Sequence, residues 1–111
     1  MRLISNIKDH HDFKRAMLYQ SKEGCYLFLY DKVEDGPCKE DYLFDDIKDA
    51  KDKCKLEYGI TEPEWSEIPD PMSGCQDDWI APVRVKGRDS GHPEWGVFQK
   101  LENGNWIDIQ G

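Results

Sequence analysis

The stretch CYLFLYDK, residues 25–32, decides the fold class of this chain. Its apolar residues occupy both faces of an extended strand: Cys25, Leu27 and Leu29 on one face, and Tyr26, Phe28 and Tyr30 on the other. A strand without a polar face is typical of the interior of a sheet that is covered on both sides. The stretch therefore predicts a sheet with other elements packed on it.

Two helices are expected to pack on this sheet. The first is predicted from about residue 10 to residue 20, with Asp9 as its N-cap. Gly24 follows it and can end the element in a left-handed conformation. One stripe of this segment is apolar except at its last position: Phe13, Ala16, Met17 and Gln20.

The second predicted helix carries stronger signals. Asp45 or Asp46 can act as its N-cap, and Gly59 stands just past its end. Between the apolar positions lie charged residues that form a solvated face. Because Cys54 falls on the apolar stripe, it is predicted to be a small buried packing residue. The stripe consists of Phe44, Ile47, Ala50 or Lys51, Cys54 and Tyr58.

The C-terminal third is predicted to be β structure. Residues 79–86, WIAPVRVK, alternate as a strand, and Pro82 indicates an edge strand or a bulge because it cannot donate to a ladder. Residues 95–110, WGVFQKLENGNWIDIQ, are predicted to form a hairpin, since Asn103 and Gly104 suit a type I′ turn. The register that follows pairs Leu101 with Trp106 on one face and Phe98 with Ile109 on the other.

The remaining segments complete the predicted fold. Residues 2–7 can form a short strand or an extended lead-in, residues 33–41 a turn region, and residues 87–94 a loop. The 111 residues are enough for one core. We therefore predict a single α+β domain over residues 1–111: an antiparallel or mixed sheet of four to five strands, two helices packed on it, and a C-terminal β-hairpin.

The cysteines and the apolar content predict a cytoplasmic location. The four cysteines are scattered and form no C-x-x-C pair, which favours reduced thiols over disulfides or structural zinc. The first residues lack the apolar segment of a secretory signal. No apolar run approaches the ~20 residues that cross a bilayer, so no membrane association is expected.

The negative charge is concentrated in one part of the chain. Residues 56–83 contain seven acidic residues and no Lys or Arg, a net charge of −7 out of the −8 of the whole chain. Pairing inside this span cannot neutralise it. Such a field repels nucleic acid and anionic lipid and favours a basic protein partner. The alternative is that the acids only keep a small protein soluble.

Candidates for chemistry are few. Cys75 and His92 both precede predicted strands and could meet as a nucleophile and its base, although no thiol-enzyme motif surrounds either residue. This pair carries the alternative interpretation of the chain, a small thiol-dependent or hydrolytic enzyme. In the preferred interpretation there are no catalytic residues.

Metal, cofactor and nucleic-acid sites are not predicted. Asp70, Asp77 and Asp78 could offer oxygens to Ca²⁺, but the pattern of a calcium loop is absent. There is no phosphate loop and no dinucleotide fingerprint, so no cofactor is expected. The one basic cluster, Arg84, Lys86 and Arg88, is short, which argues against nucleic acid as a partner class in a chain of pI 4.8. This basic cluster is interpreted as one solvent-exposed face of a strand, or as a patch that pairs with the acidic residues of the same chain.

The segment between the second predicted helix and the strand predicted over residues 79–86 is the predicted partner-binding surface. Three prolines restrict its backbone, which lowers the entropy lost when it is ordered. Aromatic residues would supply buried area, and carboxylates would steer and pair with Arg or Lys. The alternative is that both tryptophans plug the sheet. The predicted contact residues are Glu64, Trp65, Glu67, Asp70, Asp77, Asp78 and Trp79.

Several motifs carry a resemblance. WSEIPDPMSGCQDDWIAPVRVKGR (residues 65–88) and WGVFQKLENGNW (residues 95–106), together with YLFLYD (residues 26–31) and DYLF (residues 41–44), resemble a group of small bacterial proteins. Some such small acidic proteins resemble immunity partners of polymorphic toxins, which bind and silence a toxin domain. The resemblance implies an immunity-type inhibitor of a basic toxin domain and supplies no catalytic residue.

Overall fold

The computed structural model describes residues 1–109, and these divide into two compact units. The first unit is Met1–Glu34 with Cys38–Asp70, and the second is Asp35–Pro37 with the chain from Pro71 onward. Each unit has its own antiparallel sheet. The α+β class is confirmed. The expectation of one domain over residues 1–111 stays a prediction, because a division into compact units does not show how the chain unfolds.

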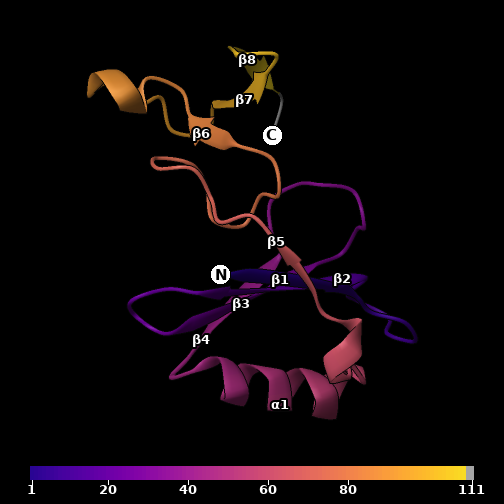
Figure 1. The fold of residues 1–111 in the computed structure, drawn as a ribbon. Helices are drawn as coiled ribbons and strands as arrows, with labels where there is room; N and C mark the ends of the chain where they lie inside the picture. The colour runs from indigo at the N-terminus through magenta and orange to yellow at the C-terminus, as the bar shows by residue number, and fades with distance from the viewer. Residues whose placement is uncertain (110–111) are drawn as a thin grey trace. The chain divides into compact units, whose positions relative to one another are not determined.

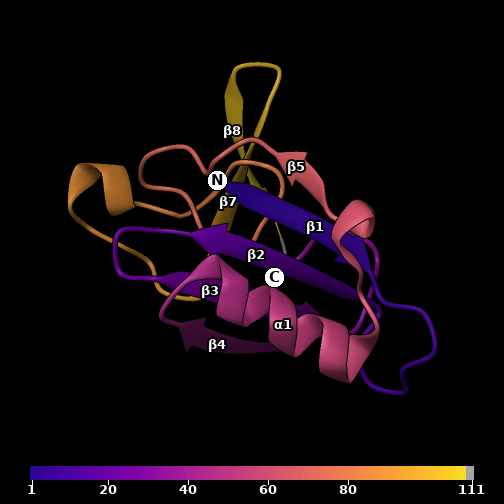
Figure 2. The ribbon, with the colours of Figure 1, turned by 60° about the horizontal axis from the view of Figure 1, so that its bottom comes forward.

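The first unit is a five-stranded antiparallel sheet with the helix α1 (Ile47–Tyr58) on one face (Figure 1, Figure 2). The strand order β4-β3-β2-β1-β5 places β3 in the interior of the sheet, as predicted. A short η1 helix (Glu62–Glu64) precedes β5. The strands are β1 (Arg2–Asn6), β2 (Arg15–Gln20), β3 (Cys25–Tyr30), β4 (Glu40–Phe44) and β5 (Ser66–Ile68).

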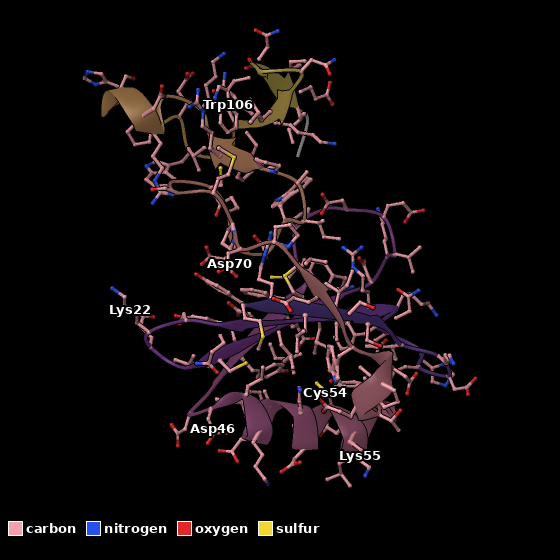
Figure 3. All side chains as sticks on the ribbon, viewed as in Figure 1. Lys22, Asp46, Cys54, Lys55, Asp70 and Trp106 are labelled. Atoms are coloured by element: carbon pink, nitrogen blue, oxygen red, sulfur yellow. The ribbon has the colours of Figure 1, made fainter. Side chains whose placement is uncertain are left out.

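A continuous core lies between α1 and the sheet. Ala50 and Cys54 of the helix are fully buried against strand residues, and Figure 3 shows Cys54 on the side of α1 that faces the sheet. Cys54 is thus the buried packing residue that the sequence predicted. Side chains on both faces of β3 are also largely buried, as its two apolar faces required. The cluster comprises Leu3, Ile7, Phe13, Ala16, Leu18, Cys25, Leu27, Leu29, Ala50, Cys54 and Ile60.

The predicted first helix is wrong, because its second half is the strand β2. Ala16 pairs with Ser5 of β1 and with Leu29 of β3, so β2 is hydrogen-bonded on both sides. Backbone hydrogen bonds to two neighbouring strands stabilise residues 15–20 as a strand more than their weak helix propensity stabilises a helix. Gly24 does not end a helix; its φ of +143° lies in the β2–β3 turn, where a Cβ would be 2.4 Å from the carbonyl oxygen of Phe44.

The second predicted helix is confirmed with both of its ends. The Asp46 side chain accepts a hydrogen bond from the Asp49 N–H at 2.8 Å, which is N-cap geometry. Gly59 has a φ of +69° and donates its N–H to the helix C-terminal carbonyls. Phe44, which was assigned to the helical stripe, instead ends β4 and packs against the core.

The second unit is a three-stranded sheet of order β6-β7-β8, made of β6 (Val83–Val85), β7 (Phe98–Glu102) and β8 (Asn105–Ile109), with a short η2 helix (Arg88–Ser90). The predicted hairpin is confirmed. Asn103 and Gly104 have φ angles of 50° and 80°, as a type I′ turn requires. The observed pairs Leu101–Trp106 and Phe98–Ile109 match the predicted register. Gln110 of the predicted hairpin lies outside the described residues.

The strand predicted over residues 79–86 is shorter than expected. Only Val83–Val85 pairs as β6, and β6 is an edge strand, as Pro82 indicated. Before it, the Asp35 carboxylate accepts hydrogen bonds from the N–H groups of Ile80 and Ala81, both at 2.8 Å. A side chain therefore satisfies backbone donors that a longer strand would have paired.

The predicted architecture needs two corrections. There is one α-helix in the described residues instead of two, and the strands form two sheets instead of a single sheet of four to five strands. Both errors come from strand pairing between distant segments, which sequence periodicity does not reveal.

Candidate functional site

The acidic segment of residues 56–83 is less negative in its effect than its composition indicates. Several of its carboxylates form ion pairs with cationic groups that lie outside the segment. The pairs are Glu57 with Lys53, Glu62 with Lys51 at 2.6 Å, Glu64 with Lys8 at 3.8 Å, and Asp70 with the amino group of Met1 at 2.8 Å. These pairs weaken the field that the segment presents to a partner.

Glu64 has a structural task in addition. Its Oε1 accepts hydrogen bonds from the N–H of Thr61 at 2.9 Å and from the Thr61 hydroxyl at 2.8 Å, which forms a capping box at η1. These hydrogen bonds lower the pKa of the Glu64 carboxyl. A partner that paired with Glu64 would have to compete with this cap.

The two tryptophans of the predicted surface lie inward. Trp79 is buried, with 9% of its surface exposed, and Trp65 is half-buried and packs against the core of the first unit. Trp65 therefore contributes to the core of the first unit, and Trp79 offers little surface to a partner. Glu67, Asp70 and Asp77 are the members of the predicted set that are exposed, and Asp78 is half-buried. Contact of this set with a partner stays a prediction.

Cys75 and His92 do not form a hydrogen bond with each other in the described part of the chain. Cys75 is buried, and this burial raises the pKa of its thiol, against the opposing effect of Arg84 and Arg88. His92 is exposed in the loop after η2. A thiol nucleophile needs a base in reach and an accessible thiolate. The buried Cys75 thiol lacks both of these features in the described geometry.

Within residues 1–109, no three His, Cys, Asp or Glu side chains are grouped so that they could hold a metal ion. None of the described helices combines the length and the apolar character that a membrane crossing requires.

The edge strand β4 exposes two large apolar residues of the first unit. It lies at the end of the five-stranded sheet, so its outer edge has no neighbouring strand among the described residues. Tyr42 and Leu43 have exposed fractions of 48% and 53%. An uncovered edge offers unpaired backbone groups to an extended segment of another chain.

A groove runs beside this edge. A cavity of about 400 Å³ lies between β4 and α1, and apolar or aromatic side chains form most of its wall. Its polar members are Lys53 and Glu57, which are paired with each other. The lining residues are Leu27, Tyr42, Leu43, Phe44, Lys53, Glu57 and Tyr58. The groove can take apolar side chains of a segment that pairs with β4.

Acidic residues flank Tyr42, Leu43 and Phe44 in the sequence. Residues 40–47 carry four acids and no Lys or Arg: Glu40, Asp41, Asp45 and Asp46. Glu40 accepts a hydrogen bond from the Tyr42 hydroxyl at 2.8 Å, which raises the pKa of Tyr42. Asp46 caps α1, whereas Asp41 and Asp45 have exposed carboxylates without an ion pair in the described residues.

The sequence patterns do not predict this edge, because helical spacing places Phe44 on the stripe of α1 and Gly36-Pro37 makes residues 33–41 a turn region. The available signal was the run Tyr42, Leu43 and Phe44 directly after the turn that Gly36 and Pro37 mark. Three large apolar residues before an N-cap can be a short strand as well as the start of a helix.

No known protein family matches the chain, and no curated protein or solved structure shows significant similarity to it. The resemblance to immunity partners of toxins therefore stays a prediction.

Proposed function

We propose that this protein binds a basic protein partner through the β4 edge and the groove beside it. The observation that carries the proposal is an uncovered edge strand with exposed apolar residues, flanked by a cavity of about 400 Å³ and by acidic side chains. The binding mode is addition of an extended segment to the sheet.

Each part of the site has a distinct task. The backbone of β4 supplies hydrogen bonds that are largely independent of the partner's sequence, and the groove selects an apolar side chain. The carboxylates of Asp41 and Asp45 attract Lys or Arg at alternate positions of the partner and raise the association rate. A segment of alternating basic and apolar residues fits these features best.

The narrower proposal is that the protein is an immunity-type inhibitor that masks a basic toxin domain. It is supported by the acidity of the chain and by the lack of a thiol–base pair at Cys75 and His92. We expect a reading frame for a basic toxin domain directly upstream of the gene. We also expect the protein to inhibit that toxin when the two are co-expressed. An unrelated neighbour, or a toxin that stays active, would count against it.

The binding proposal can be tested by NMR with a peptide of alternating Lys and Val as the probe. Amide signals of residues 40–45 are expected to shift in a saturable way, and binding is expected to weaken as salt is added. Charge reversal by Asp41→Lys with Asp45→Lys should weaken binding about tenfold or more at low ionic strength, because two favourable charges become repulsive.

A matched reversal separates the two candidate surfaces. Asp77→Lys with Asp78→Lys changes the net charge by the same amount in the acidic segment, and we expect a clearly smaller loss of binding. If this second variant loses binding and the β4 variant does not, the acidic segment is the contact surface and the assignment to β4 is wrong. If neither reversal matters, the electrostatic basis of the proposal fails.

A further inference from the structure

The second unit contains a small cavity with basic walls. It measures about 300 Å³. Its lining comes from three parts of the chain: the turn before Cys75, β6 with η2, and β8, where Figure 3 labels Trp106. The residues are Ser73, Gly74, Arg84, Arg88, Asp89 and Trp106. A concave site with a few polar groups and one aromatic ring is typical of small-molecule binding.

Arg84 is held in a fixed orientation. Its guanidinium carbon lies 3.9 Å from the centre of the Trp106 ring, a close cation–π contact. Its Nε donates to Oε1 of Gln99 at 3.2 Å, and its Nη1 lies 3.5 Å from Oδ2 of Asp89. The Arg84 side chain is only 18% exposed. Little conformational freedom remains to be lost when an anion binds.

The neighbouring side chains fix this arrangement further. Gln99 donates from Nε2 to Oδ1 of Asp108 at 3.0 Å, which turns its Oε1 toward Arg84. Asp108 is in turn paired with Lys86 at 2.6 Å, and these two contacts lower the pKa of the Asp108 carboxyl. A hydrogen-bonded chain across the three-stranded sheet therefore orients the guanidinium.

Donors remain available in the cavity. Among the described residues, Nη2 of Arg84 has no hydrogen-bond partner and the Arg88 guanidinium has no ion pair. The turn that carries Ser73 and Gly74 is closed by a hydrogen bond from the Cys75 N–H to the Met72 carbonyl oxygen at 3.0 Å. It adds the Ser73 hydroxyl to the wall of the cavity.

The charge balance of the cavity selects the kind of anion. Two guanidinium groups and the single carboxylate of Asp89 leave a net charge of +1, within a chain of net charge −8. Planar guanidinium groups match the geometry of oxyanions. A monoanion neutralises the net charge of the cavity. A dianion would leave an excess negative charge there and would be repelled more strongly by Asp89.

We propose that this cavity binds a small monoanionic carboxylate. The carboxylate oxygens accept hydrogen bonds from Arg84 and Arg88, and the body of the ligand lies beside Trp106. This site is in the second unit and does not depend on the binding of a protein by β4.

The test uses the full chain with benzoate as the probe, at constant ionic strength. The indole N–H signal of Trp106, identified by its loss in Trp106→Phe, is expected to shift and to saturate as benzoate is added. Inorganic phosphate is the second probe, and we expect it to bind more weakly than benzoate. No saturable shift with benzoate overturns the proposal, and tighter binding of phosphate overturns the choice of a carboxylate.

Three variants test the assigned residues. Arg88→Gln removes an exposed side chain, so the fold should persist, and benzoate affinity should fall about tenfold. Lys100→Gln, the matched control, removes a positive charge from the same sheet outside the cavity and should leave the affinity nearly unchanged. Asp89→Asn should tighten binding, because it removes the competing carboxylate. Equal losses in Arg88→Gln and Lys100→Gln would reduce the effect to net charge and reject the site.

Discussion

Arg15 shows how this fold accommodates a single charged residue. The side chain is 4% exposed, and its Nη1 donates to the carbonyl oxygen of Val33 at 2.6 Å. The guanidinium lies over the ring of Tyr30 at 4.6 Å. In the described structure, Nε and Nη2 of Arg15 have no hydrogen-bond partner. Buried donors without partners cost free energy, which offsets part of what the Val33 hydrogen bond and the Tyr30 contact contribute.

Replacement of Arg15 by an apolar residue of similar length should therefore be tolerated. We expect Arg15→Met to keep or raise the free energy of unfolding, by about 1 kcal/mol, since the unsatisfied donors are removed together with the hydrogen bond to Val33. Arg15→Ala should lower it by about 2 kcal/mol, because it leaves a cavity. Urea denaturation measures both. A strongly destabilised Arg15→Met variant would show that the charge is compensated.

The helix α1 is the element that local chemistry specifies most completely. Asp46 caps its first turn, and Gly59 ends it in the left-handed region. Lys48 pairs with Asp52 and Lys53 with Glu57, each four residues apart on the solvent side. The opposite side places Ala50 and Cys54 against the sheet. Capping, pairing and burial thus agree on the same twelve-residue helix.

The N-cap can be tested against the acid next to it. Asp46→Ala is expected to lower the free energy of unfolding by about 1 kcal/mol, because the N–H of Asp49 loses its acceptor. Asp45→Ala removes the same charge one residue earlier without removing a cap hydrogen bond, and its effect should be within about 0.5 kcal/mol. Thermal unfolding followed by circular dichroism compares the two. Equal losses would attribute the effect to charge near the helix N-terminus.

At the scale of the whole molecule, the reactivity of the cysteine thiols measures unfolding of the chain. All four are free thiols. Cys25 and Cys54 have no exposed surface, and burial raises the pKa of Cys25 to about 11 and that of Cys54 to about 12. Cys38 is half-buried in the segment before β4. The two core thiols can react only when the first unit opens.

Thiol labelling at neutral pH is therefore expected to be strongly heterogeneous. Cys38 should react first, and Cys25 and Cys54 should react only at the rate of unfolding, with an acceleration in urea that follows the unfolding transition. Mass spectrometry of labelled peptides identifies each site. The Cys38→Ser variant should lose the fast reaction alone. Rapid labelling of Cys54 in the native protein would contradict its place in the core.

The sequence by itself determined the elements whose signals are local. The caps at Asp46 and Gly59 predicted α1, the Asn103–Gly104 turn predicted the hairpin and its register, and the two apolar faces of residues 25–30 predicted the interior strand. Each of these signals lies within a few residues of the element that it specifies, so no knowledge of distant partners was needed.

Only the tertiary structure decided which segments pair as strands and which residues line the cavities. Residues 15–20 became β2 because β1 and β3 pair with them on both sides, and Glu40–Phe44 became an edge strand because β3 offered a partner. The β4 groove and the cavity of Arg84 and Trp106 each combine residues from separate segments. Pairing and cavities depend on contacts between distant parts of the chain, and periodicity within one segment carries no record of them.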